Sequence, residues 1–374
     1  MTFFDRRPSA RWGVTILAAV LLTAGASGIG ALSANAGDKL APRTASQLLV
    51  DVQQAKVSGL SGTIVQNADL GLPSLPGFGS TGSSDMTSLV SGSHTLRLWY
   101  AGPNRVRLSL LGQLGESDVI HNGGDLWTWS SKDKTASHRT IPTTSKDNTP
   151  SLESTAPTSP QQAAEEALKA IDPSTKVSTI GNSTVAGRSA YELLLQPRDS
   201  TSLVGSVRIA IDGKTHLPTR VQVFAKNADK PSFEIAFTSF DPTTPSASVF
   251  AFNPPPGTKV TEQKGTPDML KGPEATAPKS SLEKHSAQAD SGGPKIVGSG
   301  WSSVVVTKAS LPGGSDASGG GSLTRVLRDL PKVSGSWGSG HLLQGTLFSA
   351  LLTDDGRLAV GAVAPEALHA ALGS

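Results

Sequence analysis

Residues 118–130, with the sequence "DVIHNGGDLWTWS", contain the signal that decides the fold of this chain. Asn122-Gly123 is a dipeptide that favours the tight turn between two antiparallel strands. Beyond the turn, Trp127 and Trp129 lie two positions apart, and such positions point to the same face of a sheet. The chain of 374 residues has only 6 Trp. Two of them on one strand therefore pose the question of what that face of the sheet contacts.

Further segments with alternating apolar and polar residues surround this hairpin and predict a large antiparallel sheet. Asp212-Gly213 gives a second hairpin signal among them. The segments are 93–102, 104–112, 187–197, 205–225 and 231–240.

Only two helices are predicted within this region. Thr44 and Gln47 have the spacing of a capping box at the start of the first helix. Ser159, Pro160 and Gln162 supply an N-cap, a first-turn proline and a capping glutamine for the second, which is expected to extend to about residue 171. Two helices are too few to cover both faces of such a sheet. The predicted fold class is therefore mainly β, within the α+β type.

Residues 1–36 have the organisation of a secretory signal peptide. Arg6, Arg7 and Arg11 supply positive charge, an uncharged run begins at Trp12, and Ala34-Asn35-Ala36 forms a cleavage site of the A-x-A kind. The uncharged run is also long enough to span a bilayer, so residues 12–34 would anchor the chain if they were not cut. Both alternatives predict an extracytoplasmic protein, secreted or associated with the cell envelope.

Composition divides the rest of the chain into three parts. Residues 40–260 contain the predicted sheet. Residues 261–295 are rich in Lys, Pro, Ser and Gly and are predicted to be a flexible linker. Residues 296–374 are predicted to form a small α+β domain with a first strand, a helix at 322–330, a hairpin that turns at Asp355-Gly356 and a final helix.

Neither catalytic nor nucleic-acid-binding chemistry is indicated by the sequence. The formal net charge is only +3, without a long basic run, so nucleic acid is not an expected partner. The chain has no Cys, which excludes disulfides, thiolate metal sites and a cysteine nucleophile. Residues 77–82 match G-x-G-x-x-G but lie in a loop of Gly, Ser and Pro, and not between a strand and a helix as dinucleotide binding requires. No cofactor and no metal site is predicted.

The seven His have no metal-ligand spacing. His121 and His138 flank the tryptophans and are the pair that could meet in space, but both are expected to be surface or strand-end residues. The histidines lie at positions 94, 121, 138, 216, 285, 341 and 369.

The order of these elements, closed by "VFAFNPPPGTKV" (249–260), resembles the LolA family of periplasmic lipoprotein carriers and the N-terminal domain of the RseB/MucB family. The resemblance covers about residues 44–260. Residues 296–370 resemble the small C-terminal domain that RseB-type proteins add. For residues 44–260, the resemblance implies an unclosed antiparallel half-barrel. Its helices form a lid against a concave apolar face that takes acyl chains.

Two features depart from the LolA pattern. Lipoprotein carriers of that family have an Arg before the proline of the corresponding turn, where this chain has Gly102 before Pro103. Lid closure of the LolA type is therefore not carried over. The loop at 71–88 is longer than that fold needs, and its Leu70, Leu72, Leu75 and Phe78 are an alternative flap.

The resemblance implies that alternating apolar residues line the concave face and bind the ligand. Alternation tells which residues of a strand share a face, but it does not tell which face is concave. Ordinary core packing under a helix is the alternative interpretation of every candidate, the tryptophans included. The ligand-lining candidates are Leu96, Leu98, Tyr100, Val106, Leu108, Leu110, Trp127, Trp129, Tyr191, Leu193, Leu195, Phe233, Ile235 and Phe237.

Two hypotheses about function follow. The first is a non-enzymatic exported protein that holds the acyl chain of a lipid or lipoprotein in the apolar half-barrel. The alternative is an RseB-like regulator in which residues 296–374 bind a membrane anti-sigma factor or another envelope protein. A cell-envelope hydrolase is a remote third hypothesis, because the sequence offers no nucleophile–base pair.

Overall fold

The computed structural model describes residues 40–72, 83–141, 158–169, 171, 173–263, 295–308 and 330–373. The predicted export segment lies outside these residues, and so do Leu75, Phe78 and most of the predicted linker. All but the last residue of the predicted helix at 322–330 also lies outside them.

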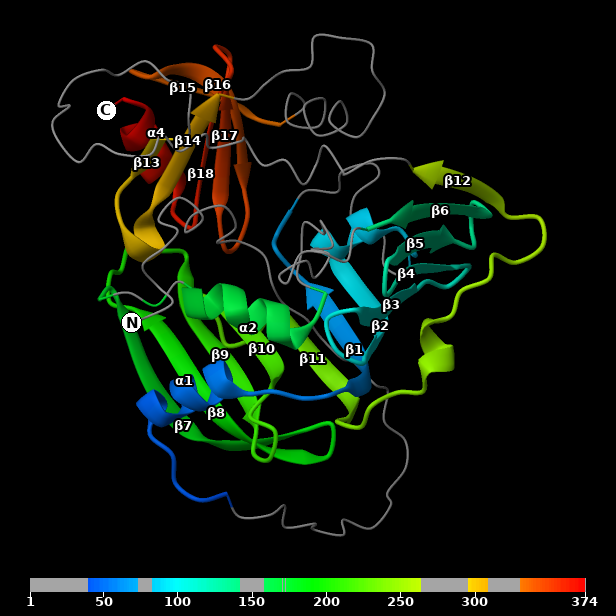
Figure 1. The fold of residues 1–374 in the computed structure, drawn as a ribbon. Coiled ribbons are helices and arrows are strands. Elements are labelled where there is room, and N and C mark those ends of the chain that lie inside the picture. Colours follow the sequence, from blue (N-terminus) through cyan, green and yellow to red (C-terminus); the bar gives the residue numbers. More distant parts are fainter. Residues whose placement is uncertain are drawn as a thin grey trace, which may run out of the picture.

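A twelve-stranded sheet forms the larger part of the molecule, and it does not close into a barrel (Figure 1). Its strand order is β12-β6-β5-β4-β3-β2-β1-β11-β10-β9-β8-β7. The mainly β fold class is confirmed. The sheet is mixed, because β12 pairs in parallel with β6 whereas the other neighbours are antiparallel. The strands are β1 (Leu60–Ala68), β2 (Gly92–Tyr100), β3 (Arg105–Leu111), β4 (Glu116–Asn122), β5 (Asp125–Ser130), β6 (Thr135–Thr140), β7 (Thr175–Val185), β8 (Arg188–Pro197), β9 (Val204–Asp212), β10 (Pro218–Ala225), β11 (Pro231–Asp241) and β12 (Lys259–Gln263).

Both predicted hairpin turns of this sheet are present. β4 and β5 meet at Asn122 and Asp125, and Gly123 has a φ of +64°, which glycine adopts without strain. Between β9 and β10, the carboxylate of Asp212 accepts hydrogen bonds from the backbone N–H groups of Lys214 and Thr215.

Two helices pack on one face of this sheet. α1 (Ala45–Gln54) begins at the predicted capping box, in which Thr44 accepts from the N–H of Gln47 and the Gln47 side chain accepts from the N–H of Thr44. α2 (Pro160–Lys169) begins at Ser159, whose hydroxyl accepts from the N–H of Gln162. α1 packs against β7, and α2 packs against β10 and β11. We call this side of the sheet the helix face.

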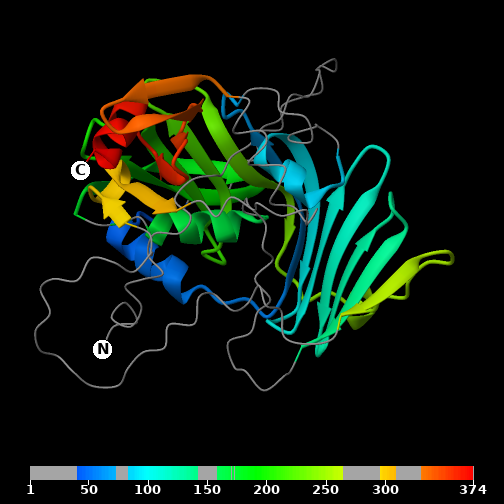
Figure 2. The ribbon, with the colours of Figure 1, turned by 90° about the horizontal axis from the view of Figure 1, so that it is seen from above.

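The sheet bends near β1, so that the β2–β6 half is inclined to the β7–β11 half (Figure 2). Figures 1 and 2 place α1 and α2 on the inner side of the bend. The segment that follows β11, from the 3₁₀ helix η4 (Ala247–Phe250) to β12, runs along the outer side. We call residues 247–263 the strap, and the side of the sheet that it covers the strap face.

The C-terminal residues form a separate six-stranded sheet in the order β13-β14-β18-β17-β16-β15. The predicted hairpin at Asp355-Gly356 joins β17 to β18, and the predicted final helix is α4. No helix in the described ranges has the length and hydropathy of a membrane span. The elements are β13 (Lys295–Val297), η6 (Gly300–Ser302), β14 (Val304–Lys308), β15 (Lys332–Gly335), β16 (Gly338–Gln344), β17 (Ser349–Thr353), β18 (Arg357–Gly361) and α4 (Pro365–Leu372).

This second sheet is docked against the large one through polar and apolar contacts. The indole N–H of Trp301 donates to the hydroxyl of Thr175 on β7 at 2.8 Å. The backbone N–H of Thr346 donates to the carbonyl of Leu70 at 2.8 Å. Trp301, Leu347 and Phe348 are buried in the same apolar core as the helix face of the large sheet. The two sheets therefore share part of one core.

Candidate functional site

Twelve of the fourteen ligand-lining candidates lie together on the helix face. The strand pairing joins them into one surface, because residues opposite each other on neighbouring strands share a face. On β2 and β3, Leu96 pairs with Leu110, Leu98 with Leu108, and Tyr100 with Val106. Through β1, Ile64 pairs with both Leu96 and Phe237, and through β10 and β9 this surface reaches the candidates of β8. The twelve are Leu96, Leu98, Tyr100, Val106, Leu108, Leu110, Tyr191, Leu193, Leu195, Phe233, Ile235 and Phe237.

Most of this surface is packed core in the structure. Nine of the twelve residues are buried, while Leu98, Tyr100 and Val106 on β2 and β3 are half-buried. These three lie beyond the strands that α1 and α2 cover (Figure 1). The helix face is thus a closed core over β7–β11 and becomes partly accessible over β2 and β3.

A buried polar pair interrupts the apolar helix face, and the sequence analysis did not single it out. Gln66 on β1 and His94 on β2 lie opposite each other and are almost fully buried. Gln66 donates from Nε2 to the carbonyl of Leu89 at 2.8 Å, and Nε2 of His94 lies 2.9 Å from the carbonyl of Ser91 and so carries the proton. Oε1 of Gln66 and Nδ1 of His94 are therefore acceptors without a partner among the described residues. The only available signal was a glutamine at a core-facing position, between Ile64 and Ala68.

Trp127 and Trp129 lie on the opposite, strap face. Trp127 pairs with Ile120 and His138, and Trp129 with Asp118, none of which lies on the helix face. The ring of Phe252 in the strap lies 5.3 Å from the ring of Trp127 and 6.1 Å from that of Trp129. The fourteen candidates thus do not line one surface. The tryptophans contact the strap through Phe252, and no α-helix covers them in the described part of the chain.

His138 fastens the strap to the same place. Its ring stacks on Trp127 with the centroids 4.2 Å apart. Its Nε2 lies 2.8 Å from a carboxylate oxygen of Asp125, and its Nδ1 lies 2.9 Å from one of Glu262 in β12. The hydrogen bond to Asp125 is the largest influence on the pKa of His138 and raises it above its ordinary value. Burial opposes this rise, and the hydrogen bond to Glu262 adds to it.

His121, the other histidine beside the tryptophans, does not meet His138. It pairs with Val106 and lies on the helix face, where its Nε2 is 2.9 Å from the carbonyl of Gly123. Within the described residues, no group of three or more His, Asp or Glu side chains is placed to hold a metal ion.

A charged cluster on β3 and β4 holds the other end of the strap. Arg107 donates to the carbonyl of Val249 at 3.2 Å and forms an ion pair with the buried carboxylate of Asp118. The hydroxyl of Ser109 also donates to Asp118. Burial, and next the negative charge of Asp118, raise the pKa of the neighbouring Glu116.

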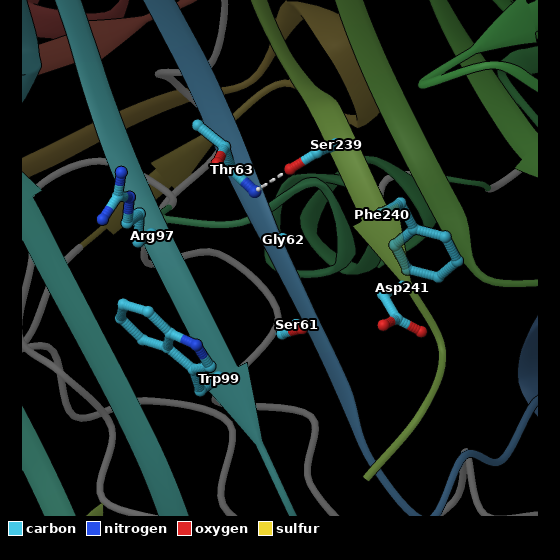
Figure 3. Close-up of a pocket in the computed structure, with 8 residues that line it drawn as sticks. All are labelled: Ser61, Gly62, Thr63, Arg97, Trp99, Ser239, Phe240 and Asp241. Carbon is cyan, nitrogen blue, oxygen red and sulfur yellow. Dashed lines mark hydrogen bonds between the residues drawn. The ribbon is translucent and has the colours of Figure 1, made fainter. Parts of the chain in front are cut away.

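A groove of about 350 Å³ opens on the strap face at the bend of the sheet (Figure 3). Trp99 on β2 is in cation–π contact with Arg107, whose guanidinium carbon lies 5.6 Å from the centre of the indole. The lining of the groove consists of Ser61, Gly62 and Thr63 from β1, Arg97 and Trp99 from β2, and Ser239, Phe240 and Asp241 from β11. None of these eight residues was a candidate from the sequence.

A β-bulge in β11 creates this groove. Phe233, Ile235 and Phe237 pair with Ala68, Gln66 and Ile64 and share the helix face. The register then shifts by one residue, so that Ser239 and Asp241 pair with Thr63 and Ser61 on the strap face. A bulge of this kind re-aims side chains within one strand.

Gly102 explains one departure from the LolA pattern. It lies in the turn between β2 and β3 with a φ of +87°. An arginine would adopt this left-handed conformation only with strain, so the backbone of this turn favours glycine.

An unclosed sheet with helices on its inner side and a small second sheet is similar to the LolA and MucB folds. Residues 83–262 match the family model DUF2092, described as a predicted periplasmic protein. This description agrees with the extracytoplasmic location predicted from residues 1–36. No curated protein matches the sequence.

Several solved structures are similar to this chain in fold. The MucA/MucB complex structure of Pseudomonas aeruginosa matches with 16% identity, covering 88% of this chain and 97% of that chain, with a TM-score of 0.41. A LolA superfamily protein from Nitrosomonas europaea matches with 10% identity, covering 56% and 99%, with a TM-score of 0.21. An uncharacterized conserved protein from Thermus thermophilus matches with 10% identity, covering 59% and 99%, with a TM-score of 0.32.

Proposed function

We propose that this chain is a non-enzymatic extracytoplasmic protein that binds the acyl chain of a lipid or lipoprotein on its helix face. The observation that supports this most directly is the apolar surface that extends from Tyr191 on β8 to Val106 on β3 and that only the polar pair Gln66 and His94 interrupts. Its β2–β3 end is the part that is half-buried. An acyl chain laid over Leu98, Tyr100 and Val106 would extend the existing core across this end.

Binding of an acyl chain to this surface needs no charged contact. Each CH₂ group removed from water contributes about 0.8 kcal/mol, so that one long chain supplies most of the binding free energy. The spare acceptors of Gln66 and His94 would accept a hydrogen bond from a hydroxyl or amide N–H at the head of the ligand. A hydrogen bond from the ligand to one of these buried acceptors would stabilise the complex relative to the free protein.

The non-enzymatic part of the proposal rests on the separation of the histidines. General acid–base catalysis needs a base within hydrogen-bond reach of the proton that it removes. His121 and His138 lie on opposite faces of the sheet, so they do not form one acid–base pair.

Mass spectrometry of organic extracts tests the proposal. Residues 37–374, exported and purified gently from the native host, are expected to carry a stoichiometric lipid or acylated peptide. Leu98→Asp places a carboxylate in the half-buried region and should reduce the occupancy at least tenfold.

Two variants serve as controls in this experiment. Leu114→Asp is a matched control, because Leu114 is 96% exposed, and Trp127→Ala on the strap face should likewise retain the lipid. An empty wild-type protein that also fails to bind a fluorescent fatty acid would rule out acyl binding.

The alternative function is binding of an envelope protein, such as a membrane anti-sigma factor, through residues 296–374. The observation in its favour is the outer edge of β13, with which no described strand pairs and where Ile296 is 40% exposed. Such edges accept a strand from a partner. A photo-crosslinking residue at 296, in the native host, should then capture one membrane protein that the same residue at the exposed position 366 does not capture.

A further inference from the structure

The groove at the bend of the sheet is independent of the acyl-binding proposal. Six of its eight lining residues lie on the strap face, whereas Gly62 and Phe240 pair with each other on the helix face, which carries the twelve apolar candidates. The lining of the groove is polar and aromatic, unlike the helix face. It therefore suits a different class of ligand.

The aromatic part of the groove is Trp99. Arg107 in contact with its indole is itself held by Asp118 and by the carbonyl of Val249. These contacts fix the ring in one orientation beside β1 (Figure 3). A fixed, partly exposed indole offers a flat apolar surface against which a sugar ring can place its C–H groups, with little loss of side-chain entropy.

Hydroxyl groups surround this platform. Ser61 and Thr63 on β1 and Ser239 on β11 contribute three of them, and the Ser239 hydroxyl already accepts from the N–H of Thr63 at 3.0 Å. Each remaining hydroxyl hydrogen can donate to a ligand oxygen, and the lone pairs of Ser61 and Thr63 can accept. Such mixed donors and acceptors match the hydroxyls of a saccharide.

The charges at the two sides of the groove differ in their surroundings. Asp241 accepts from the N–H of Thr243 at 3.1 Å and lies in the field of Arg188. Arg97, by contrast, is exposed and has no ion pair among the described residues. A guanidinium free to make two parallel hydrogen bonds favours a carboxylate or phosphate on the ligand.

From this combination we infer that the groove formed by β1, β2 and β11 binds an anionic saccharide, a sugar that carries a carboxylate or a phosphate. Trp99 stacks on the sugar ring, Arg97 binds the anionic group, and Ser61, Thr63, Ser239 and Asp241 bind ring hydroxyls. The volume of about 350 Å³ lies at the lower end of the range for small-molecule sites, and this fits one or two sugar residues.

Isothermal titration calorimetry with the whole exported chain tests this inference. The probes are digalacturonate for a carboxylate, glucose 6-phosphate for a phosphate, and digalactose as the neutral counterpart of the first. Binding of at least one anionic probe is expected, with shifts of the amide signals of Ser61 and Thr63 in the ¹H–¹⁵N spectrum. Digalactose should bind about tenfold more weakly than digalacturonate.

Two variants locate the site. Arg97→Gln should weaken the anionic probe about tenfold without changing the affinity for digalactose, since it removes one charge-assisted contact. Trp99→Leu should weaken all probes. Arg198→Gln, at an exposed arginine outside the groove, is the matched control and should bind as the wild type does.

Three results would overturn the inference: no binding of any probe, equal binding of the neutral and anionic probes, or binding that survives both groove variants. Fatty-acid binding by the same variants keeps the two proposals apart. It is expected to be unchanged, because neither Arg97 nor Trp99 lies on the helix face.

Discussion

Replacement of Phe250 by alanine is expected to release the strap from the sheet. Phe250 is 1% exposed, and η4 packs on β3 and β4. Truncation of a buried phenylalanine costs about 3–5 kcal/mol, because the contacts of the ring are lost and a cavity remains. With tenfold for each 1.4 kcal/mol, the equilibrium constant for local opening of the strap should rise about a hundredfold to a few thousandfold.

Native-state hydrogen exchange of the β12 amides measures this opening, since β12 pairs only with β6 at the edge of the sheet. Exchange in the central strand β9 is the internal reference and should change far less. Ala251→Ser alters the exposed neighbour and is the matched control. Unchanged exchange in β12, or an equal acceleration in β9, would refute the idea that Phe250 anchors a locally opening strap.

Three further substitutions test contacts elsewhere in the fold. Asp212 is buried, and its hydrogen bonds from Arg188 and Thr215 hold its pKa below the ordinary value although burial alone would raise it. Asp212→Ala should lower the free energy of unfolding by about 3 kcal/mol at pH 7, because it breaks a mostly buried ion pair. The difference in urea denaturation from the wild type should shrink as the pH falls below about 4 and through the lowered pKa. The raised pKa of His138 gives a contribution to stability with the opposite pH dependence. This contribution is complete below about pH 6.5 and is lost as the pH rises through the folded pKa. A rise in pH should therefore accelerate hydrogen exchange of the β12 amides, beyond the intrinsic pH effect, in the wild type and not in His138→Gln. Trp301→Ala should uncouple the two sheets, so that calorimetry resolves a separate, earlier transition for the C-terminal sheet, whereas Trp301→Phe should retain most of the coupling. A single transition with an unchanged midpoint would contradict the assigned docking role.

Local features of the fold could be predicted from the sequence because they depend on residues close together in the chain. The capping box at Thr44 needs only a residue three positions on, and the turn at Asn122-Gly123 needs only a glycine able to adopt a positive φ. Alternation likewise assigned Leu96, Leu98 and Tyr100 to one face of β2. These signals predicted β2–β5, β8–β11, both helices on the sheet and the hairpins, but not β7 or β12.

The environment of Trp127 and Trp129 could not be predicted in this way. Alternation relates residues within one strand, whereas the face of one strand relative to a distant strand depends on the register of every pair between them. The partner of the tryptophans, Phe252, lies more than 120 residues further along the chain. The parallel pairing of β12 with β6 that brings it there has no local signal.

The bulge in β11 shows why the groove was also missed in the sequence analysis. The segment "PSFEIAFTSF" (231–240) alternates as far as Phe237, and an unbroken two-residue period would place Ser239 and Asp241 on the same face as Phe233, Ile235 and Phe237. The register shift opposite Thr63 and Ile64 instead moves them to the strap face. One extra residue thus lets a single strand supply apolar side chains to one proposed site and polar side chains to the other. A β-bulge is thereby the element through which the two faces of this sheet acquire different chemistry.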